Sequence, residues 1–213
     1  VDAMGGEDSP KKIVDGIKLF NKNNKDVYFK IFGNKNTIES HLNNFIDKNS
    51  FEIINTENQV VDTDSALSGA KKGKDTSMWL AIESVKNKES DIVISAGNTG
   101  ALFVISKLNL KMIENIDKPA LSGLWPNKNG MNVVLDLGAN IDCSEKNLID
   151  FALMGSSLFK SLFSNETPKV ALLNVGSEEI KGNDKIKNTY KKLSEIRNNN
   201  FEFKGYIEGN KIM

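Results

Sequence analysis

The chain has 213 residues, of which 39% are hydrophobic and 26% charged, and its 28 basic residues balance its 28 acidic ones. This length suffices for a substantial core, and the neutral balance argues against a nucleic-acid partner. No run of apolar residues approaches the length of about 20 residues that is needed to cross a bilayer. Cys143 is the only cysteine, which excludes a disulfide within the chain and indicates a reducing cytoplasm. Arg197 is the only arginine, so a phosphate site elsewhere has to use backbone N–H groups, hydroxyls, amides and lysines.

Helical and strand patterns alternate along the chain. The predicted elements are helix 10–21, strand 27–32, helix 37–44, strand 51–54, helix 77–86, strand 91–95, helix 99–113, strands 120–124 and 132–137, helix 145–163, strand 169–175, helix 184–197 and strand 201–207. Continuously apolar runs such as 133–135 are typical of parallel strands covered on both faces. The alternation predicts a three-layer α/β/α fold with a mainly parallel sheet, as one catalytic domain over 1–213. The chain starts as though at the end of a strand and stops soon after another, so we expect truncation at both ends.

The least regular segment is 55–75, which ends in a lysine cluster formed by Lys71, Lys72 and Lys74. It has two interpretations. It is either a solvated loop or a mobile cationic flap over an anionic substrate.

Four turns that contain glycine each follow the end of a predicted strand. In an open parallel sheet, ligands bind beyond the carboxyl ends of the strands, so we expect these turns at one edge. Their acidic, amide and hydroxyl groups together favour a binding cleft over ordinary loops. The turns are 2–6, 95–100, 136–142 and 174–183.

The turn at 95–100 joins an apolar run directly to a helical pattern. Unpaired N–H groups and the helix dipole at such a junction suit a phosphate, although a tight turn without a ligand has the same pattern. The glycines at 97 and 100 match neither the dinucleotide fingerprint nor a P-loop.

Several polar residues of the turns have both a functional and a structural interpretation. Asp2 and Asp136 are interpreted either as ligands of a metal or substrate or as residues that cap turns. Asn98 and Thr99 are interpreted either as ligand contacts or as helix caps. Lys181 is interpreted either as a cation that neutralises a phosphate or as a surface lysine.

Three other residues raise the same question. Glu178 and Glu179 are candidate bases or helix-start charges. A covalent acyl-enzyme on Cys143 has no support from a histidine nearby in the sequence, so a buried, inert thiol is favoured.

Six distinctive segments follow one another in a fixed order along the chain. They are Asp2-Ala-Met-Gly-Gly-Glu-Asp, Thr76-Ser-Met-Trp-Leu-Ala-Ile, Ser95-Ala-Gly-Asn-Thr-Gly-Ala-Leu, Leu135-Asp-Leu-Gly-Ala-Asn-Ile-Asp-Cys, Phe151-Ala-Leu-Met-Gly-Ser and Leu172-Leu-Asn-Val-Gly-Ser-Glu-Glu-Ile-Lys-Gly-Asn. This ordered set resembles the bacterial phosphate acyltransferases of phospholipid synthesis. The resemblance covers nearly the whole chain. Its departures include Glu7 for an aspartate and Lys118 for an arginine, and the second change removes a guanidinium fork that could hold phosphate.

The resemblance implies a reversible reaction in which phosphate attacks the thioester of a fatty acyl-[acyl carrier protein] to give an acyl phosphate. It also implies a Rossmann-like fold similar to isocitrate and isopropylmalate dehydrogenases and phosphotransacetylases. The protein is expected to be a cytoplasmic homodimer with peripheral membrane contact, whose product passes to a membrane glycerol-3-phosphate acyltransferase. We expect no cofactor and no metal.

On the turns and the resemblance together, we expect catalytic roles for Lys181, Asn98, Asp136 and Asn140. The expected substrate- and phosphate-binding residues are Asp2, Gly5, Gly6, Ser95, Gly97, Thr99, Gly100, Gly138, Glu179 and Asn183. Phosphate would attack directly, without an acyl-enzyme, while backbone N–H groups stabilise the oxyanion. The alternatives are a short-chain phosphotransacylase using acyl-CoA, a metal-dependent decarboxylating dehydrogenase, and a non-catalytic binding module.

Overall fold

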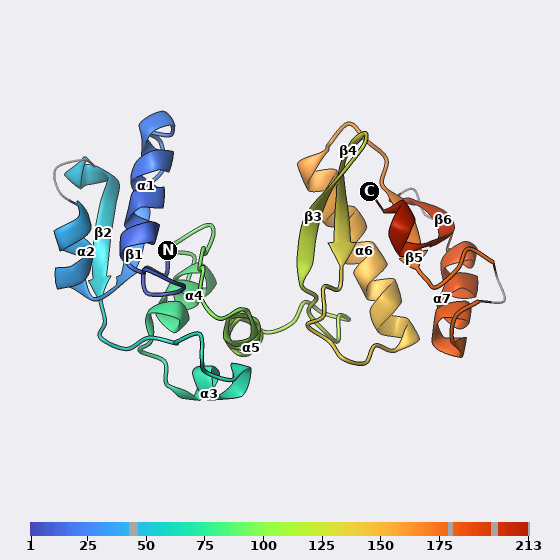
Figure 1. The fold of residues 1–213 in the computed structure, drawn as a ribbon, viewed down its shortest axis with the longest axis horizontal. Coiled ribbons are helices and arrows are strands. Elements are labelled where there is room, and N and C mark those ends of the chain that lie inside the picture. The colour runs from blue at the N-terminus through green and yellow to red at the C-terminus, as the bar shows by residue number, and fades with distance from the viewer. Residues whose placement is uncertain (43–46, 179–180, 197–199, 213) are drawn as a thin grey trace. The chain divides into compact units, whose positions relative to one another are not determined.

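The computed structural model describes residues 1–42, 47–178, 181–196 and 200–212. The chain divides into two compact units, Val1–Lys111 (unit 1) and Met112–Met213 (unit 2) (Figure 1). The single domain over 1–213 stays a prediction. Within the described ranges, none of the helices has the length and apolar character needed to cross a membrane.

Unit 1 is built on a pair of parallel strands covered by helices. Its elements are α1 (Lys11–Asn23), β1 (Phe29–Gly33), α2 (Lys35–Leu42), the 3-10 helix η1 (Lys48–Ser50), β2 (Phe51–Asn55), α3 (Ala66–Lys71), α4 (Ser77–Lys86) and α5 (Thr99–Leu110). Phe29 pairs with Phe51 at one end of the two-stranded ladder and Gly33 with Asn55 at the other.

Two hydrophobic clusters form the core of unit 1. The first packs α1 and α2 against β1 and includes Val14 and Ile31, both without exposed surface. The second joins α4 and α5, with Ile82 and Ile105 at its centre and Val60 added from the chain before α3. The second cluster therefore fixes the start of α5, where the predicted phosphate turn ends.

Unit 2 contains an antiparallel hairpin and a second parallel pair. Its elements are β3 (Ser122–Asn127), β4 (Gly130–Leu135), α6 (Glu145–Leu162), β5 (Lys169–Leu173), α7 (Asp184–Glu195), β6 (Glu202–Ile207) and the 3-10 helix η2 (Gly209–Lys211). β3 pairs with β4, and β5 runs parallel to β6 with Leu173 opposite Ile207. Leu172, Leu193 and Phe201 form its buried cluster.

The α/β class is confirmed, and two of the three strand pairs in the described residues are parallel. Three local expectations are wrong. The apolar run 133–135, expected in a parallel strand, lies in β4, which runs antiparallel to β3. The chain at 91–95 is no strand, because in the described part of the chain its one strand-like backbone hydrogen bond is from the Asp2 N–H to the Ile94 carbonyl (2.9 Å), and Ile92 is 71% exposed. The segment 55–75 is no uniform solvated loop, since it contains α3 and buries Val60.

Candidate functional site

The glycine turns 2–6 and 95–100 of unit 1 lie against each other. Residues 1–3 run beside β1, where the Ala3 N–H donates to the Phe32 carbonyl (2.9 Å). A Cβ on Gly5 would lie 2.7 Å from the Gly97 nitrogen, and one on Gly6 would lie 2.7 Å from the Ala96 carbonyl oxygen. The two turns can approach this closely only because both positions lack a side chain.

A short chain of hydrogen bonds joins the same turns. The hydroxyl of Ser95 donates to the Asp2 Oδ2 (2.7 Å) and accepts from the Gly97 N–H (3.2 Å). Asp2 is only 1% exposed, and its Oδ1 accepts from the Met4 N–H (3.2 Å). Because a hydroxyl has one proton, Ser95 has none left to donate to a phosphate.

Donors that remain available include those at the first turn of α5. Asn98 caps this helix by accepting from the Ala101 N–H (2.9 Å). Among the described residues, the N–H groups of Thr99 and Gly100 and the Thr99 hydroxyl have no hydrogen-bond partner. Thr99 is also exposed. These groups, together with the helix dipole, give the turn its capacity to bind an anion.

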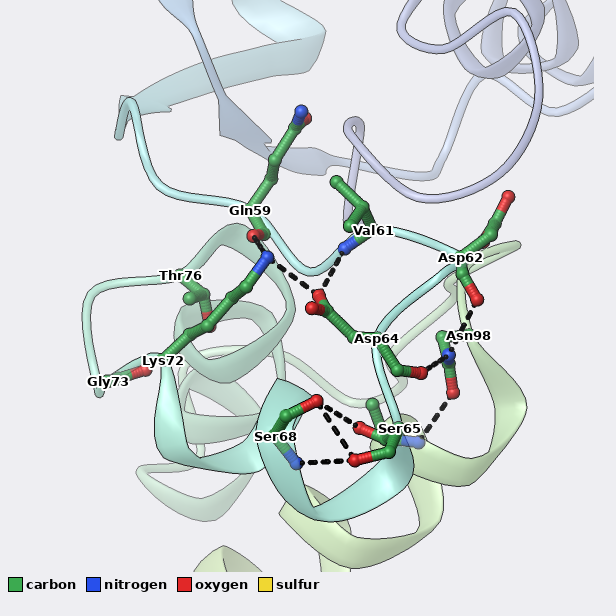
Figure 2. A network of polar contacts seen from close by, with 11 residues as sticks. Gln59, Val61, Asp62, Asp64, Ser65, Ser68, Lys72, Gly73, Thr76 and Asn98 are labelled. Carbon is green, nitrogen blue, oxygen red and sulfur yellow. Dashed lines mark hydrogen bonds and ion pairs between the residues drawn. The ribbon is translucent and has the colours of Figure 1, made fainter.

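Residues 60–72 cover one side of this turn and belong to the segment 55–75, for which a solvated loop and a mobile cationic flap were the two interpretations from sequence. Ser65 caps α3 by accepting from the Ser68 N–H (3.1 Å), and Lys72 forms an ion pair with Asp64 (2.7 Å). The Ser65–Ser68 spacing before a short apolar run is a capping signal that could have revealed α3. Asn98 connects this segment to the turn (Figure 2).

In unit 2, the turn 136–142 is organised around one carboxylate. Asp136 accepts hydrogen bonds from the N–H groups of Leu121 (2.9 Å), Ala139 (3.2 Å) and Asn140 (2.8 Å). The Asn140 side chain donates to the same carboxylate (2.9 Å) and to the Pro119 carbonyl (2.8 Å).

These bonds determine the charge state of Asp136. Burial raises its pKa, but the hydrogen bonds from the Asn140 side chain and from the backbone outweigh burial and hold the pKa below the usual range. An ionised carboxylate that already accepts four hydrogen bonds is suited to hold a turn and is a weak candidate for a general base. Gly138, at φ +88°, closes the turn with open space around it.

The second turn of unit 2 surrounds Lys181. Asn174 donates to the carbonyls of Gly176 (3.1 Å) and Lys181 (3.2 Å), which closes the loop. Asn183 caps α7 by accepting from the Ile186 N–H (3.0 Å). The stem of Lys181 packs on Gly176, where a Cβ would lie 3.0 Å from the Lys181 Cγ.

An open cavity of about 440 Å³ adjoins this turn and is lined by Leu173, Asn174, Val175, Gly182, Asn183, Ile186 and Gly209. Asn183 of the predicted set therefore faces a hollow, whereas the predicted Glu179 lies outside the described residues. Asn174, which belongs to the predicted turn 174–183 but was not among the predicted site residues, is a further polar residue of this cavity.

Cys143 borders a second open cavity of about 500 Å³, also in unit 2. Burial, and then the Asp136 carboxylate, raise the pKa of the Cys143 thiol, which therefore stays protonated near neutral pH. This is the opposite of an activated nucleophile. The described residues contain no group of three or more His, Cys, Asp or Glu side chains placed to hold a metal ion.

The structure thus brings the predicted residues together in groups within each unit. In unit 1, Asp2, Gly5, Gly6, Ser95, Gly97, Asn98, Thr99 and Gly100 share one arrangement. In unit 2, Asp136, Gly138 and Asn140 share one turn, and Lys181 and Asn183 share another.

Comparison with known proteins identifies the family. The family model described as "Fatty acid synthesis protein" matches residues 1–213. The chain belongs to this family. The Pelagibacter ubique (strain HTCC1062) protein named phosphate acyltransferase is 68% identical over all 213 residues. The Neorickettsia sennetsu phosphate acyltransferase is 43% identical, again over 100% of this chain.

The same comparisons bear on length and fold. The chain spans 64% and 63% of these two family members. The crystal structure of a branched-chain phosphotransacylase from Enterococcus faecalis V583 resembles this chain with a TM-score of 0.50 and 16% identity, covering 97% of this chain and 66% of that one. At this identity the likeness concerns the fold alone, and it agrees with the Rossmann-like class.

Proposed function

We propose that the chain is part of an acyltransferase that reversibly forms an acyl phosphate from a fatty acyl-[acyl carrier protein] and inorganic phosphate. The observation that carries this proposal is the 68% identity, over the whole chain, to a protein named phosphate acyltransferase. The family's description, which refers to fatty acid synthesis, supports a fatty acyl donor. The open N–H groups at the start of α5 support phosphate as the acceptor.

The proposed reaction is a direct transfer. A phosphate oxygen attacks the thioester carbonyl carbon, so that a C–O bond forms and the C–S bond breaks. The sulfur leaves with the bonding electrons and is protonated to the free thiol of the carrier protein. The raised pKa of Cys143 supports a route without an acyl-enzyme, because that thiol stays protonated.

Each unit contributes its own part of this proposal. In unit 1, the N–H groups of Thr99 and Gly100 bind phosphate oxygens, and Ser95 holds Gly97 in place. In unit 2, Lys181 supplies a cation and Asn183 lines the adjoining cavity. Asp136 and Asn140 maintain the turn they share through their mutual hydrogen bond.

The Lys181→Ala variant tests the assignment of that lysine. We expect the KM for phosphate to rise about tenfold with little change in kcat, since one charge-assisted contact is lost from binding. Lys191→Ala, on the exposed face of α7, is the matched control and should leave both constants unchanged. An unaltered phosphate KM in the Lys181→Ala variant would contradict the proposed role of Lys181.

The proposed partners are the acyl carrier protein, a second copy of the chain in a homodimer, and a glycerol-3-phosphate acyltransferase at the inner membrane face. These follow from the family resemblance alone. Light scattering of the full-length protein and its co-sedimentation with anionic vesicles test the dimer and the peripheral contact.

Donor comparison is the experiment that decides the activity. The full-length protein should consume a long-chain acyl-[acyl carrier protein] only when phosphate is present, and acyl phosphate should accumulate. Higher activity with a short-chain acyl-CoA would favour a phosphotransacylase, and no phosphate-dependent consumption of either donor would overturn the proposal.

A further inference from the structure

The segment 60–72, which we call the tethered segment, is docked on the first turn of α5 through small residues. A Cβ on Gly69 would lie 2.9 Å from both the Ala101 Cβ and the Val60 Cγ1. A Cβ on Gly100 would lie 3.0 Å from the Ala66 Cβ. Neither contact has room for another carbon, so the spacing between α3 and α5 is set by these glycines.

Asn98 supplies the hydrogen bonds between this segment and the turn 95–100. Its Nδ2 donates to the Asp64 carbonyl (2.7 Å) and to the Asp62 carbonyl (3.2 Å), and its Oδ1 accepts from the Ala101 N–H (2.9 Å). Figure 2 shows the amide reaching from α5 to the two carbonyls. Both amide protons are therefore engaged, and none is left to donate to a substrate.

The tethered segment is also held closed from within. The Asp64 Oδ2 contacts the Lys72 Nζ (2.7 Å) and accepts from the Val61 N–H (2.8 Å), while Lys72 donates to the Gln59 carbonyl (3.4 Å) (Figure 2). These bonds shape the segment but do not reach the turn 95–100. Asn98 is thus the polar link between a closed segment and the open N–H groups of α5.

From this geometry we infer that Asn98 is a positioning residue of the phosphate site and not a catalytic residue. Its amide fixes the tethered segment against α5 and thereby holds the Thr99 and Gly100 N–H groups in the orientation that binds the anion. The inference rests on the proposed function for its kinetic part only. Its structural part, the tether itself, can be tested without turnover.

Asn98→Ser separates the tether from the helix cap. Serine is as good an N-cap as asparagine and adds no charge near the anion, but it cannot reach the two carbonyls. Limited proteolysis with trypsin then measures opening of the tethered segment. Trypsin cleaves after lysine, and Lys71 and Lys72 lie within the segment while Lys74 lies just beyond it. We expect native-state cleavage there to rise about tenfold, with the global melting temperature nearly unchanged.

Kinetics of the full-length Asn98→Ser variant complete the test. A positioning role predicts that the KM for phosphate rises about tenfold while kcat changes less than about threefold. Asn34→Ser, the same substitution beside α2, should leave cleavage after these lysines and the phosphate KM unaltered.

Each other outcome overturns the inference. Unchanged cleavage shows that Asn98 is no tether, whether or not the protein has the proposed activity. A large fall in kcat with unchanged cleavage shows that Asn98 acts on the substrate directly. Faster cleavage with unchanged phosphate KM reduces Asn98 to a structural residue.

Discussion

Protons and lone pairs limit which residues of the glycine turns can still bind a substrate. The Ser95 hydroxyl donates to Asp2, and both Asn140 amide protons are taken by Asp136 and Pro119. These protons are therefore already engaged within the turns and are not free to bind a substrate. The hydroxyl and N–H of Thr99 have no partner in the described chain, so Thr99 is a strong candidate for the direct phosphate ligand proposed in unit 1.

Gly97→Ala tests the close approach of the two turns. The added carbon would lie 3.0 Å from the Gly5 Cα and 3.1 Å from the Met78 Cε, so the Gly5 backbone and the Met78 side chain must shift to admit it. Overpacking of this kind costs about 1–3 kcal/mol, and we expect the Ser95–Asp2 contact and the activity to be lost with it. Urea unfolding and the phosphate-dependent assay measure the two effects.

Gly16→Ala is the matched control for this substitution. Gly16 lies on the exposed face of α1 with no atom within 4 Å of an added Cβ. Replacing a helical glycine with alanine at such a site should stabilise the protein by about 0.5–1 kcal/mol and leave activity intact. Equal effects at both positions would show that the contact between the turns is unimportant.

Cys143→Ala tests the route without an acyl-enzyme. Burial and Asp136 raise the pKa of this thiol, so little thiolate exists at neutral pH. We expect the variant to keep most of its activity, within about threefold, as measured by acyl phosphate formation. A loss of several orders of magnitude in a folded variant would reinstate the covalent mechanism.

At the scale of elements, α3 illustrates what the sequence could and could not predict. Ser65 and Ser68 are an adequate capping signal, but Leu67 is 59% exposed and the helix has six residues, so no apolar periodicity reveals it. Its position depends on Gly69 and Gly100 meeting side chains from distant parts of the sequence. Longer helices such as α4 and α6 were predicted closely because their apolar stripes extend over several turns.

The Asp64–Lys72 ion pair makes the closure of the tethered segment sensitive to acid. The pKa of Asp64 is held below its ordinary value. The largest cause is the hydrogen bond that its carboxylate accepts from Lys72, and the second is the hydrogen bond that it accepts from the Val61 N–H. A carboxyl group whose pKa is lowered by folding stabilises the folded state. This stabilisation is fully present above the pKa of the group in the unfolded chain, about 3.9, and is lost as the pH falls through its pKa in the folded protein. We therefore expect the segment to stay closed at neutral pH and to open below about pH 4.

Trp79 can report this opening, because it packs against the cluster that contains Val60. In a Trp125→Phe background its fluorescence should change below about pH 4, and Asp64→Asn should remove that step. Glu39→Gln, which breaks an exposed pair with Lys35, should leave the step in place. A step that persists in the Asp64→Asn variant would assign it to another carboxyl group.

At the scale of the whole molecule, the alternation of helices and strands was enough to predict the α/β class, but strand pairing was not predictable residue by residue. The run Ile92-Val93-Ile94 has the composition of a buried strand, yet among the residues that the structure describes it makes one strand-like backbone hydrogen bond, with Asp2. Burial requires a covering neighbour, and a single apolar run carries no information about that neighbour. The turns were easier to locate, since glycine, asparagine and aspartate mark them directly.

The exposed apolar side chains of the run 92–94 have consequences for stability and dye binding that can be measured. Ile92 and Ile94 are 71% and 54% exposed, so replacing both with serine removes little buried surface. We expect the free energy of unfolding to change by no more than about 0.5 kcal/mol, and binding of an apolar dye such as ANS to decrease. Ile82→Ala is the contrasting variant, because Ile82 is 0% exposed and its truncation should cost about 2–5 kcal/mol. If the double serine variant lost as much stability as Ile82→Ala, the run at 92–94 would be packed in solution as a buried strand, as the sequence predicted.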